Sequence, residues 1–187
     1  MDRRALERRT PATGIPVKRM ARLLRLFYWL PLGFLIAAPV ASALQADLIV
    51  VEKSEQRMLL FKHGLVVREY PIALGFNPEG HKRHEGDGRT PEGRYELVWR
   101  NPKSAFYRAL QISYPNEQDL EYARMNELEP GGKIMIHGSP NWVPSDDWAR
   151  QYLQPRNWTE GCIAVTNDIM DEIWYAVELG TPIEIRP

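Results

Sequence analysis

The chain of 187 residues is long enough for one globular domain together with a segment that is removed after synthesis. Its 24 basic and 24 acidic side chains give a formal net charge of zero. Residues 1–43 hold eight basic and two acidic side chains, which leaves 16 basic and 22 acidic ones in residues 44–187. This acidic balance argues against a nucleic-acid-binding protein, which needs clustered lysine and arginine to neutralise phosphates.

The N-terminal 43 residues have the three-part organisation of a secretory signal peptide. A basic region precedes an apolar core that starts at Leu26, and small residues follow at 41–43. Two prolines make the apolar core short for a transmembrane helix, which needs about 20 residues. We therefore expect export, with cleavage after Ala43 or Ala46. An uncleaved N-terminal anchor is the alternative, and it would be the only contact with a membrane.

The first 19 residues are more than an ordinary signal peptide needs. The sequence after Met20, Ala-Arg-Leu-Leu-Arg, is itself an ordinary signal start. We therefore interpret residues 1–19 as the result of a misassigned initiation codon. The folded domain is predicted to extend over residues 47–186.

The first half of this domain is predicted to be rich in strands. Runs of apolar and β-branched residues predict strands at 48–51, 57–62, 65–74, 94–100 and 110–114. The turn residues His63-Gly64 join the second and third runs, which predicts a β-hairpin.

Capping residues predict two helices in the second half. Asn116 precedes an acidic first turn and starts a helix over residues 117–124, which Gly131-Gly132 stops. Ser145 starts the other helix, which ends before Pro155.

The remaining elements surround the residues of chemical interest. A strand at 133–136 is predicted to carry His137 at its end, and a third helix starts at 166–168 with Gly180 as its C-cap. A closing strand is predicted at 181–186. The fold class is mainly β with a few helices, an α+β domain.

Residues 75–93 are predicted to form a long loop, and loops of this length are usually functional. Four of its side chains are of types that bind metals: His81, His84, Glu85 and Asp87. The neighbouring Lys82 and Arg83 would repel a cation, so we expect no metal and no cofactor. A loop that faces the substrate, with cations for a carboxylate, is favoured over a plain solvated loop.

The chain has one cysteine, Cys162, which follows Glu160-Gly161. Cysteines in exported proteins normally form pairs, so a single thiol suggests a functional role. His137, 25 positions earlier, is a candidate base for a Cys/His nucleophile pair. A buried, inert thiol is the alternative.

The chemistry of such a pair requires donors for an oxyanion. The successive backbone N–H groups of Glu160, Gly161 and Cys162 are candidates, because glycine permits a turn that a side chain would forbid. Gly138 would let the chain turn away after His137, and Ser139 or a nearby carbonyl would orient the imidazole. The pattern indicates acyl transfer through a thioester.

The chain resembles the exported L,D-transpeptidases of bacterial cell-wall metabolism, which have a YkuD-type catalytic domain. The segments that carry the resemblance are Gly86–Tyr95, Ser113–Asn116, His137-Gly138 and Thr159–Ile163. The resemblance implies a β-sandwich-like domain with Cys162 as nucleophile, His137 as base, and Gly161 and Cys162 at the oxyanion hole.

The resemblance also implies a reaction and its partners. The cysteine would attack the carbonyl of the third residue of a peptidoglycan stem peptide and expel D-alanine. An amine on another stem peptide or a wall-attached lipoprotein would accept the acyl group, in the periplasm, with consequences for cell-wall biogenesis and cell shape. Lys82, Arg89, Tyr114 and Gly138 are the implied substrate contacts.

The sequence departs from the family pattern at Glu160 and Ala164, and the interval between His137 and Cys162 is long. A carboxylate at Glu160 would oppose thiolate formation unless it contacts a substrate amine. Three tryptophans in the long interval either wall a cleft or pack a lid onto the core: Trp142, Trp148 and Trp158. The departures leave open a thiol hydrolase, either an L,D-carboxypeptidase or an amidase. A wall-binding module without activity is the third possibility.

Overall fold

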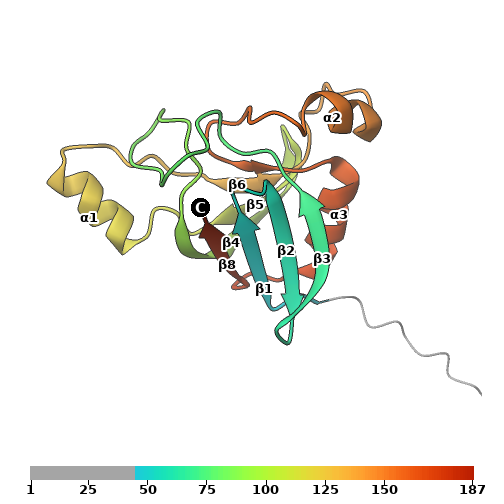
Figure 1. Cartoon of the computed structure of the whole chain (residues 1–187), viewed down its shortest axis with the longest axis horizontal. Helices are drawn as coiled ribbons and strands as arrows, with labels where there is room; N and C mark the ends of the chain where they lie inside the picture. Colours follow the sequence, from blue (N-terminus) through green and yellow to red (C-terminus); the bar gives the residue numbers. More distant parts are fainter. Residues whose placement is uncertain (1–44) are drawn as a thin grey trace, which may run out of the picture. The chain divides into compact units, whose positions relative to one another are not determined.

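The computed structural model describes residues 45–187, so the predicted signal segment 1–43 lies outside the described residues. In the described part of the chain, five strands precede the first helix, and strands and helices alternate after it (Figure 1). Their bounds are β1 Leu48–Glu52, β2 Arg57–Lys62, β3 Leu65–Pro71, β4 Gly93–Ser104, β5 Tyr107–Ile112, α1 Glu117–Met125, β6 Met135–His137, α2 Asp146–Tyr152, β7 Ile163–Ala164, α3 Asn167–Ala176 and β8 Pro182–Arg186. The predicted strands are all present, with β4 longer than expected, β3 and β6 shorter, and β5 shifted toward the N-terminus. The two-residue strand β7 was not predicted.

The strands form one sheet in the order β3-β2-β1-β8-β4-β5-β6-β7. The long strand β4 belongs to both halves, because Gly93–Glu96 pairs with β8 and the part from Leu97 onward pairs with β5. The register of β4 against β5 shifts twice, as expected where a strand bends. Bridges from Ala73 to Ala164 and from Gly75 to Thr159 connect the chain after β3 to β7, so the two sheet edges come together.

The core lies between the two halves of this closed sheet. Alternate residues of the strands point inward and are fully buried, and α3 adds Met170 and Ile173 from its apolar face. The main core residues are Ile49, Val51, Met58, Leu60, Leu97, Leu110, Ile112, Ile136, Ile163, Ile183 and Ile185. The mainly β, sandwich-like fold class is confirmed.

The starts of the helices agree with the sequence, since Asn116 forms a capping box at α1 and Ser145 caps α2. The predicted end of α1 at residue 124 is confirmed to within one residue, but the predicted stop signal, Gly131-Gly132, was wrong. The helix ends at Met125, where Glu127 takes a left-handed conformation (φ 55°) and Leu128 N–H donates to Ala123 O. This is a Schellman ending with glutamate where glycine is usual, so the sequence gives no sign of it.

The predicted C-cap of α3 at Gly180 was also wrong. The helix ends at Ala176, and Val177 is extended and buried in the core. The guanidinium of Arg100, on β4, donates to the carbonyls of Trp174 and Val177. A side chain from a distant strand thus satisfies the carbonyl groups that a terminal glycine motif would satisfy.

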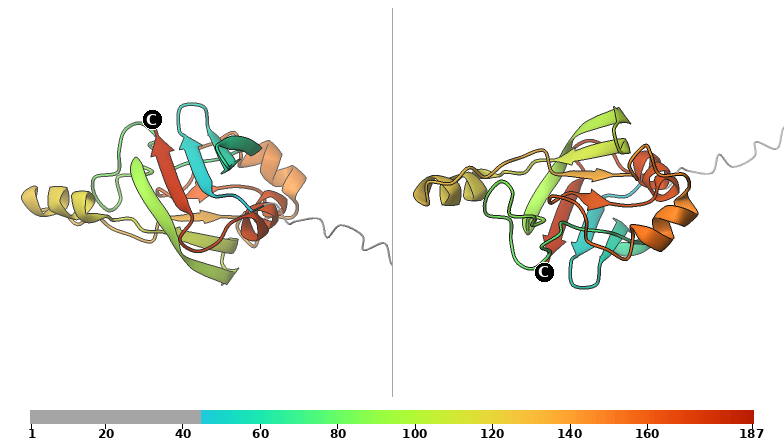
Figure 2. Two further views of the ribbon diagram at one scale, coloured as in Figure 1. Left: turned by 90° about the horizontal axis from the view of Figure 1, so that it is seen from below. Right: turned by 90° about the horizontal axis from the view of Figure 1, so that it is seen from above.

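The helices lie at two ends of the domain. Figures 1 and 2 show α1 projecting at one end, beside the loop that precedes β4, while α2 and α3 lie at the other end. Among residues 45–187, no helix combines the length and the apolarity needed to cross a membrane.

Candidate active site

Cys162 lies directly before β7, at the end of a turn that is held by hydrogen bonds. The hydroxyl of Thr159 donates to Cys162 O (2.7 Å) and accepts from Gly161 N–H (3.1 Å). Gly161 has φ 132°, and a Cβ there would lie 2.6 Å from Arg89 O. Only glycine fits this turn, because the backbone of the 75–93 loop packs directly against it.

His137 ends β6, the neighbour of β7. The two strands are parallel, and His137 is paired with Ala164. Because side chains alternate along a strand, Cys162 lies on the same face as Ala164 and His137. The two candidate catalytic residues are therefore neighbours across adjacent strands, although 24 residues separate them in the sequence.

Both side chains line a cavity of about 510 Å³. The other lining residues are Ser104, Phe106, Lys133, Met135, Trp158, Thr159 and Glu160. Of the three tryptophans in the interval before Cys162, only Trp158 lines this cavity. Trp142 and Trp148 pack edge to face against each other, with ring centroids 5.7 Å apart.

The imidazole of His137 is almost fully buried and has a defined tautomer. Its Nδ1 lies 2.7 Å from the carbonyl oxygen of Gly138, and because a carbonyl only accepts, Nδ1 carries the proton. Nε2 is then unprotonated and has a lone pair for the thiol proton. Burial lowers the pKa of His137 to about 4, so the ring is neutral at physiological pH. Phe106 and Trp158 pack against the ring, at centroid distances of 4.6 and 5.7 Å.

The thiol of Cys162 points toward Lys133 O, at 3.7 Å. Burial raises the pKa of this thiol above its usual range. The N–H of Met135 and the charge of Lys82 act to lower it, while the carboxylate of Glu160 raises it further. At neutral pH the resting pair is therefore a thiol beside a neutral imidazole, not a thiolate–imidazolium ion pair.

The two predicted oxyanion donors differ in their partners. The N–H of Gly161 donates to the Thr159 hydroxyl, so it is occupied in this arrangement. The N–H of Cys162 has no hydrogen-bond acceptor within residues 45–187. In this arrangement the Cys162 amide is the available donor.

None of the four predicted substrate contacts lies among the residues that line the cavity. Lys82 is buried and donates to Asp87 (2.9 Å) and His84 O (3.1 Å). The guanidinium of Arg89 donates to His81 O (3.4 Å).

The other two predicted contacts also have structural partners. The hydroxyl of Tyr114, a buried residue, donates to Pro130 O (2.9 Å). Gly138 donates its N–H to Phe106 O (3.1 Å), and a Cβ there would lie 2.5 Å from Asn167 Oδ1. The close packing of Gly138 against Phe106 and Asn167 therefore fixes the backbone next to His137.

The potential metal ligands of the 75–93 loop lie apart from one another. His81 pairs with Asp119 (2.9 Å) and accepts from Glu92 N–H, whereas Asp87 pairs with Lys82. No group of three or more metal-binding side chains occurs in the described part of the chain. The loop is organised by internal hydrogen bonds around Asp87.

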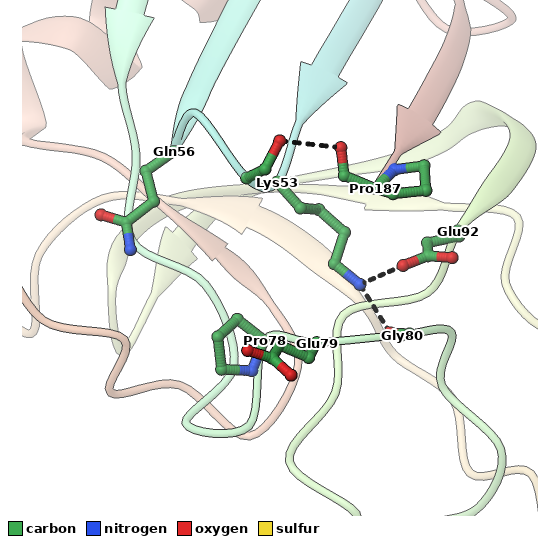
Figure 3. A pocket seen from close by; sticks show the side chains of 8 residues that line it. Lys53, Gln56, Pro78, Glu79, Gly80, Glu92 and Pro187 are labelled. Atoms are coloured by element: carbon green, nitrogen blue, oxygen red, sulfur yellow. Dashed lines mark hydrogen bonds and ion pairs between the residues drawn. The ribbon is translucent and has the colours of Figure 1, made fainter.

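A second cavity of about 430 Å³ lies at the end of β1 (Figure 3). Lys53 points into the loop there, and its ammonium donates to Gly80 O (2.6 Å), Thr90 O (3.0 Å) and Glu92 (2.8 Å). An ammonium has three donors, so all of them are used. Lys53 therefore attaches the 75–93 loop to β1 and has no donor left for a ligand.

The sequence of residues 46–185 matches the YkuD family, described as the L,D-transpeptidase catalytic domain. The chain belongs to this family. Among curated proteins, no relative matches the sequence.

Solved structures with the same fold include Bd1075 from Bdellovibrio bacteriovorus, at 29% identity and a TM-score of 0.52, covering 77% of this chain and 49% of that one. The helical cell shape determining protein Pgp2 from Campylobacter jejuni has 24% identity and a TM-score of 0.56, covering 75% of this chain and 47% of that one. This chain thus spans about half the length of each of these proteins.

Proposed function

We propose that this protein is an exported enzyme that acts on peptidoglycan stem peptides through an acyl-enzyme on Cys162. The observation that carries the proposal is the arrangement of Cys162 and His137 in one cavity. The cavity is also lined by Phe106, Met135 and Trp158, and the neutral imidazole has a lone pair at Nε2. Membership of the L,D-transpeptidase family supplies the substrate class.

In the acylation step, Nε2 of His137 takes the proton of the Cys162 thiol as Sγ attacks the carbonyl carbon of the third stem residue. The carbonyl oxygen becomes an oxyanion, to which the Cys162 N–H donates. When the C–N bond breaks, the imidazolium returns its proton to the leaving amine. D-alanine departs, and the acyl group remains on sulfur as a thioester.

In the second step, an amine attacks the thioester carbonyl carbon and gives a proton to His137. The C–S bond then breaks as the new amide bond forms, and His137 returns the proton to the Cys162 sulfur. The amine belongs to another stem peptide, which gives a cross-link, or to a wall lipoprotein, which gives its attachment. Transfer to water in the same site would make the protein an L,D-carboxypeptidase or an amidase instead.

The proposed location is the periplasm, because residues 1–43 have the pattern of a signal peptide and the substrate is the cell wall. The similarity to a cell shape determining protein is consistent with a role in wall architecture and cell shape. Fractionation of cells that express the tagged chain tests this location, and a tag recovered in the cytosol would contradict it.

The full-length protein incubated with disaccharide-tetrapeptides tests the reaction by mass spectrometry. We expect free D-alanine, dimeric products and a protein adduct with the mass of the acyl tripeptide, which hydroxylamine removes. The Cys162→Ala variant should give none of these. Shortened monomers without dimers would assign hydrolysis. Binding without product or adduct would assign a wall-binding module and refute the enzyme.

A further inference from the structure

Phe106 packs against the imidazole of His137 from the turn between β4 and β5. The centroids of the two rings are 4.6 Å apart. Phe106 is 36% exposed, whereas His137 is only 4% exposed. The phenyl side chain therefore lies between solvent and the imidazole, and it covers this side of the ring.

The turn that carries Phe106 has an unfavourable backbone. Ser104 and Tyr107 form the last pair of the hairpin, and Tyr107 has φ 64°. A left-handed residue at this position of a hairpin turn is usually glycine, because the conformation is unfavourable for a residue with a side chain. The turn has the sequence Ser-Ala-Phe-Tyr, without glycine. Contacts from outside the hairpin must therefore stabilise it.

Asn141 supplies these contacts. Its backbone N–H donates to Ala105 O (3.1 Å), its side-chain Nδ2 donates to Ser104 O (3.0 Å) and its Oδ1 accepts from Tyr107 N–H (2.9 Å). One carboxamide thus satisfies an acceptor before Phe106 and a donor after it. Aspartate could not do the same, because a carboxylate has no donor for Ser104 O.

Asn141 also belongs to the segment that begins with His137. Near the start of this segment, Gly138 N–H donates to the carbonyls of Phe106 (3.1 Å) and Arg108 (3.2 Å). The segment and the turn are therefore joined twice, once next to the imidazole and once at Asn141. The chain that carries the imidazole also carries the residue that holds its cover.

We propose that Asn141 is a positioning residue, which holds the 104–107 turn so that Phe106 stays over the imidazole of His137. The proposed base is thereby kept free of water and in one orientation. This inference rests on the proposed function for the role of His137 as a base. It goes beyond that function by assigning control of the base to a residue that does not line the cavity.

Loss of the cover would admit water to the ring. Water stabilises the imidazolium, so the pKa of His137, which burial lowers to about 4, would rise toward its ordinary value of about 6.5. The substitutions that test the proposal leave the other ionisable groups in place, so a change in the titration of His137 reports the loss of its cover. These groups are Cys162, Lys133 and Glu160 in the cavity, and Tyr107, Arg108 and Asp171, which contact one another beside the turn.

NMR titration of the full-length protein with isotope-labelled histidine tests the proposal, with His137→Gln to assign the signal. The wild-type midpoint should lie near pH 4. Asn141→Ala and Phe106→Ala should each raise it above about 5, whereas Phe106→Leu, which keeps an apolar cover, should stay near the wild type. Circular dichroism at each pH checks that the fold is retained. A wild-type midpoint near 6.5, or an unchanged midpoint in both alanine variants, would overturn the proposal.

Asn101→Ala is the matched control. Asn101 lies in the same hairpin, and its Oδ1 accepts from Lys103 N–H (3.0 Å). This variant loses one side-chain hydrogen bond of the hairpin but keeps those of Asn141, so the midpoint of His137 should not change. A rise as large as in Asn141→Ala would show a general loosening of the hairpin and would refute the specific role of Asn141.

Acyl-adduct formation with the disaccharide-tetrapeptide gives a second measurement. At neutral pH, Asn141→Ala should lower kcat by about 3- to 10-fold with little change in KM, because the base is less well aligned. The acid limb of kcat/KM should move with the NMR midpoint. A midpoint that rises in Asn141→Ala supports the role of Asn141 even if no variant forms an adduct. Adduct formation together with an unchanged midpoint would refute that role and leave the proposed function standing.

Discussion

The imidazole of His137 is neutral because it is buried and not because a carboxylate orients it. Its Nδ1–H donates to Gly138 O, and burial lowers its pKa to about 4. Nε2 of His137, the proposed base, is therefore unprotonated at any pH above about 4. We expect the acid limb of the kcat/KM profile near pH 4, well below the ordinary histidine value of about 6.5. An acid limb near pH 6.5 would show that the imidazole is solvated in the free enzyme.

The same residue should make folding stability depend on pH. The folded pKa lies below the unfolded one, so the unfolded chain binds more protons between about pH 4 and 6.5. The stabilising contribution is complete above pH 6.5 and is lost as the pH falls toward 4, by about 3 kcal/mol in total. Urea denaturation measures the free energy of unfolding of the wild type and of His137→Gln across this pH range. The decrease between about pH 6.5 and 4 that is due to His137 should appear in the wild type and be absent from the variant. Parallel stability profiles would contradict it.

At the scale of elements, the 75–93 loop packs directly behind the turn that precedes Cys162. Its centre is Asp87, whose carboxylate accepts from Lys82 and from the N–H groups of Arg83, His84 and Arg89. Burial opposes ionisation, but these donors outweigh it and lower the pKa of Asp87 to about 2. The loop is therefore a fixed part of the site.

Asp87→Asn should destabilise the protein by about 3 kcal/mol, because it leaves the buried ammonium of Lys82 without its counter-charge. Acyl-adduct formation on Cys162 should also slow, since the loop backbone supports Gly161. Thermal or urea denaturation measures the first effect. Glu79→Gln, at an exposed position of the same loop, is the control and should change stability by less than about 0.5 kcal/mol. Equal stabilities of the two variants would show that Asp87 does not organise the loop.

At the scale of the whole domain, the last strand is central in the sheet. β8 lies between β1 and β4, and Ile183 and Ile185 are buried in the core. Deletion of residues 180–187 should remove stability comparable to the whole folding free energy, about 5–10 kcal/mol, and abolish cooperative unfolding. Deletion of Pro187 alone should have little effect, because its carbonyl oxygen accepts an exposed hydrogen bond from the Ser54 hydroxyl. A cooperative melt of the longer truncation would contradict this account.

Local patterns predicted most of the fold and the centre of the candidate site. Alternating strands, the caps at Asn116 and Ser145 and the positions of Cys162 and His137 depend on nearby residues, so they are readable in the sequence. The wrong helix stop signals have non-local or unusual causes, as where Arg100 satisfies the end of α3 from a distant strand. Phe106 and Lys133 were missed as cavity residues, because no motif marks them and only the closed sheet brings them beside Cys162.

The sequence by itself determined which residues the proposed chemistry would use: one thiol after a glycine, a histidine at the end of a strand and a family-specific loop. Tertiary structure decided which groups remain free to act. It turned Lys82 and Tyr114 inward, fixed the tautomer of His137 and left Glu160 and Lys133 exposed in the cavity. The physical reason is that burial and pairing depend on contacts between distant segments, whereas the type and spacing of residues depend on the sequence alone.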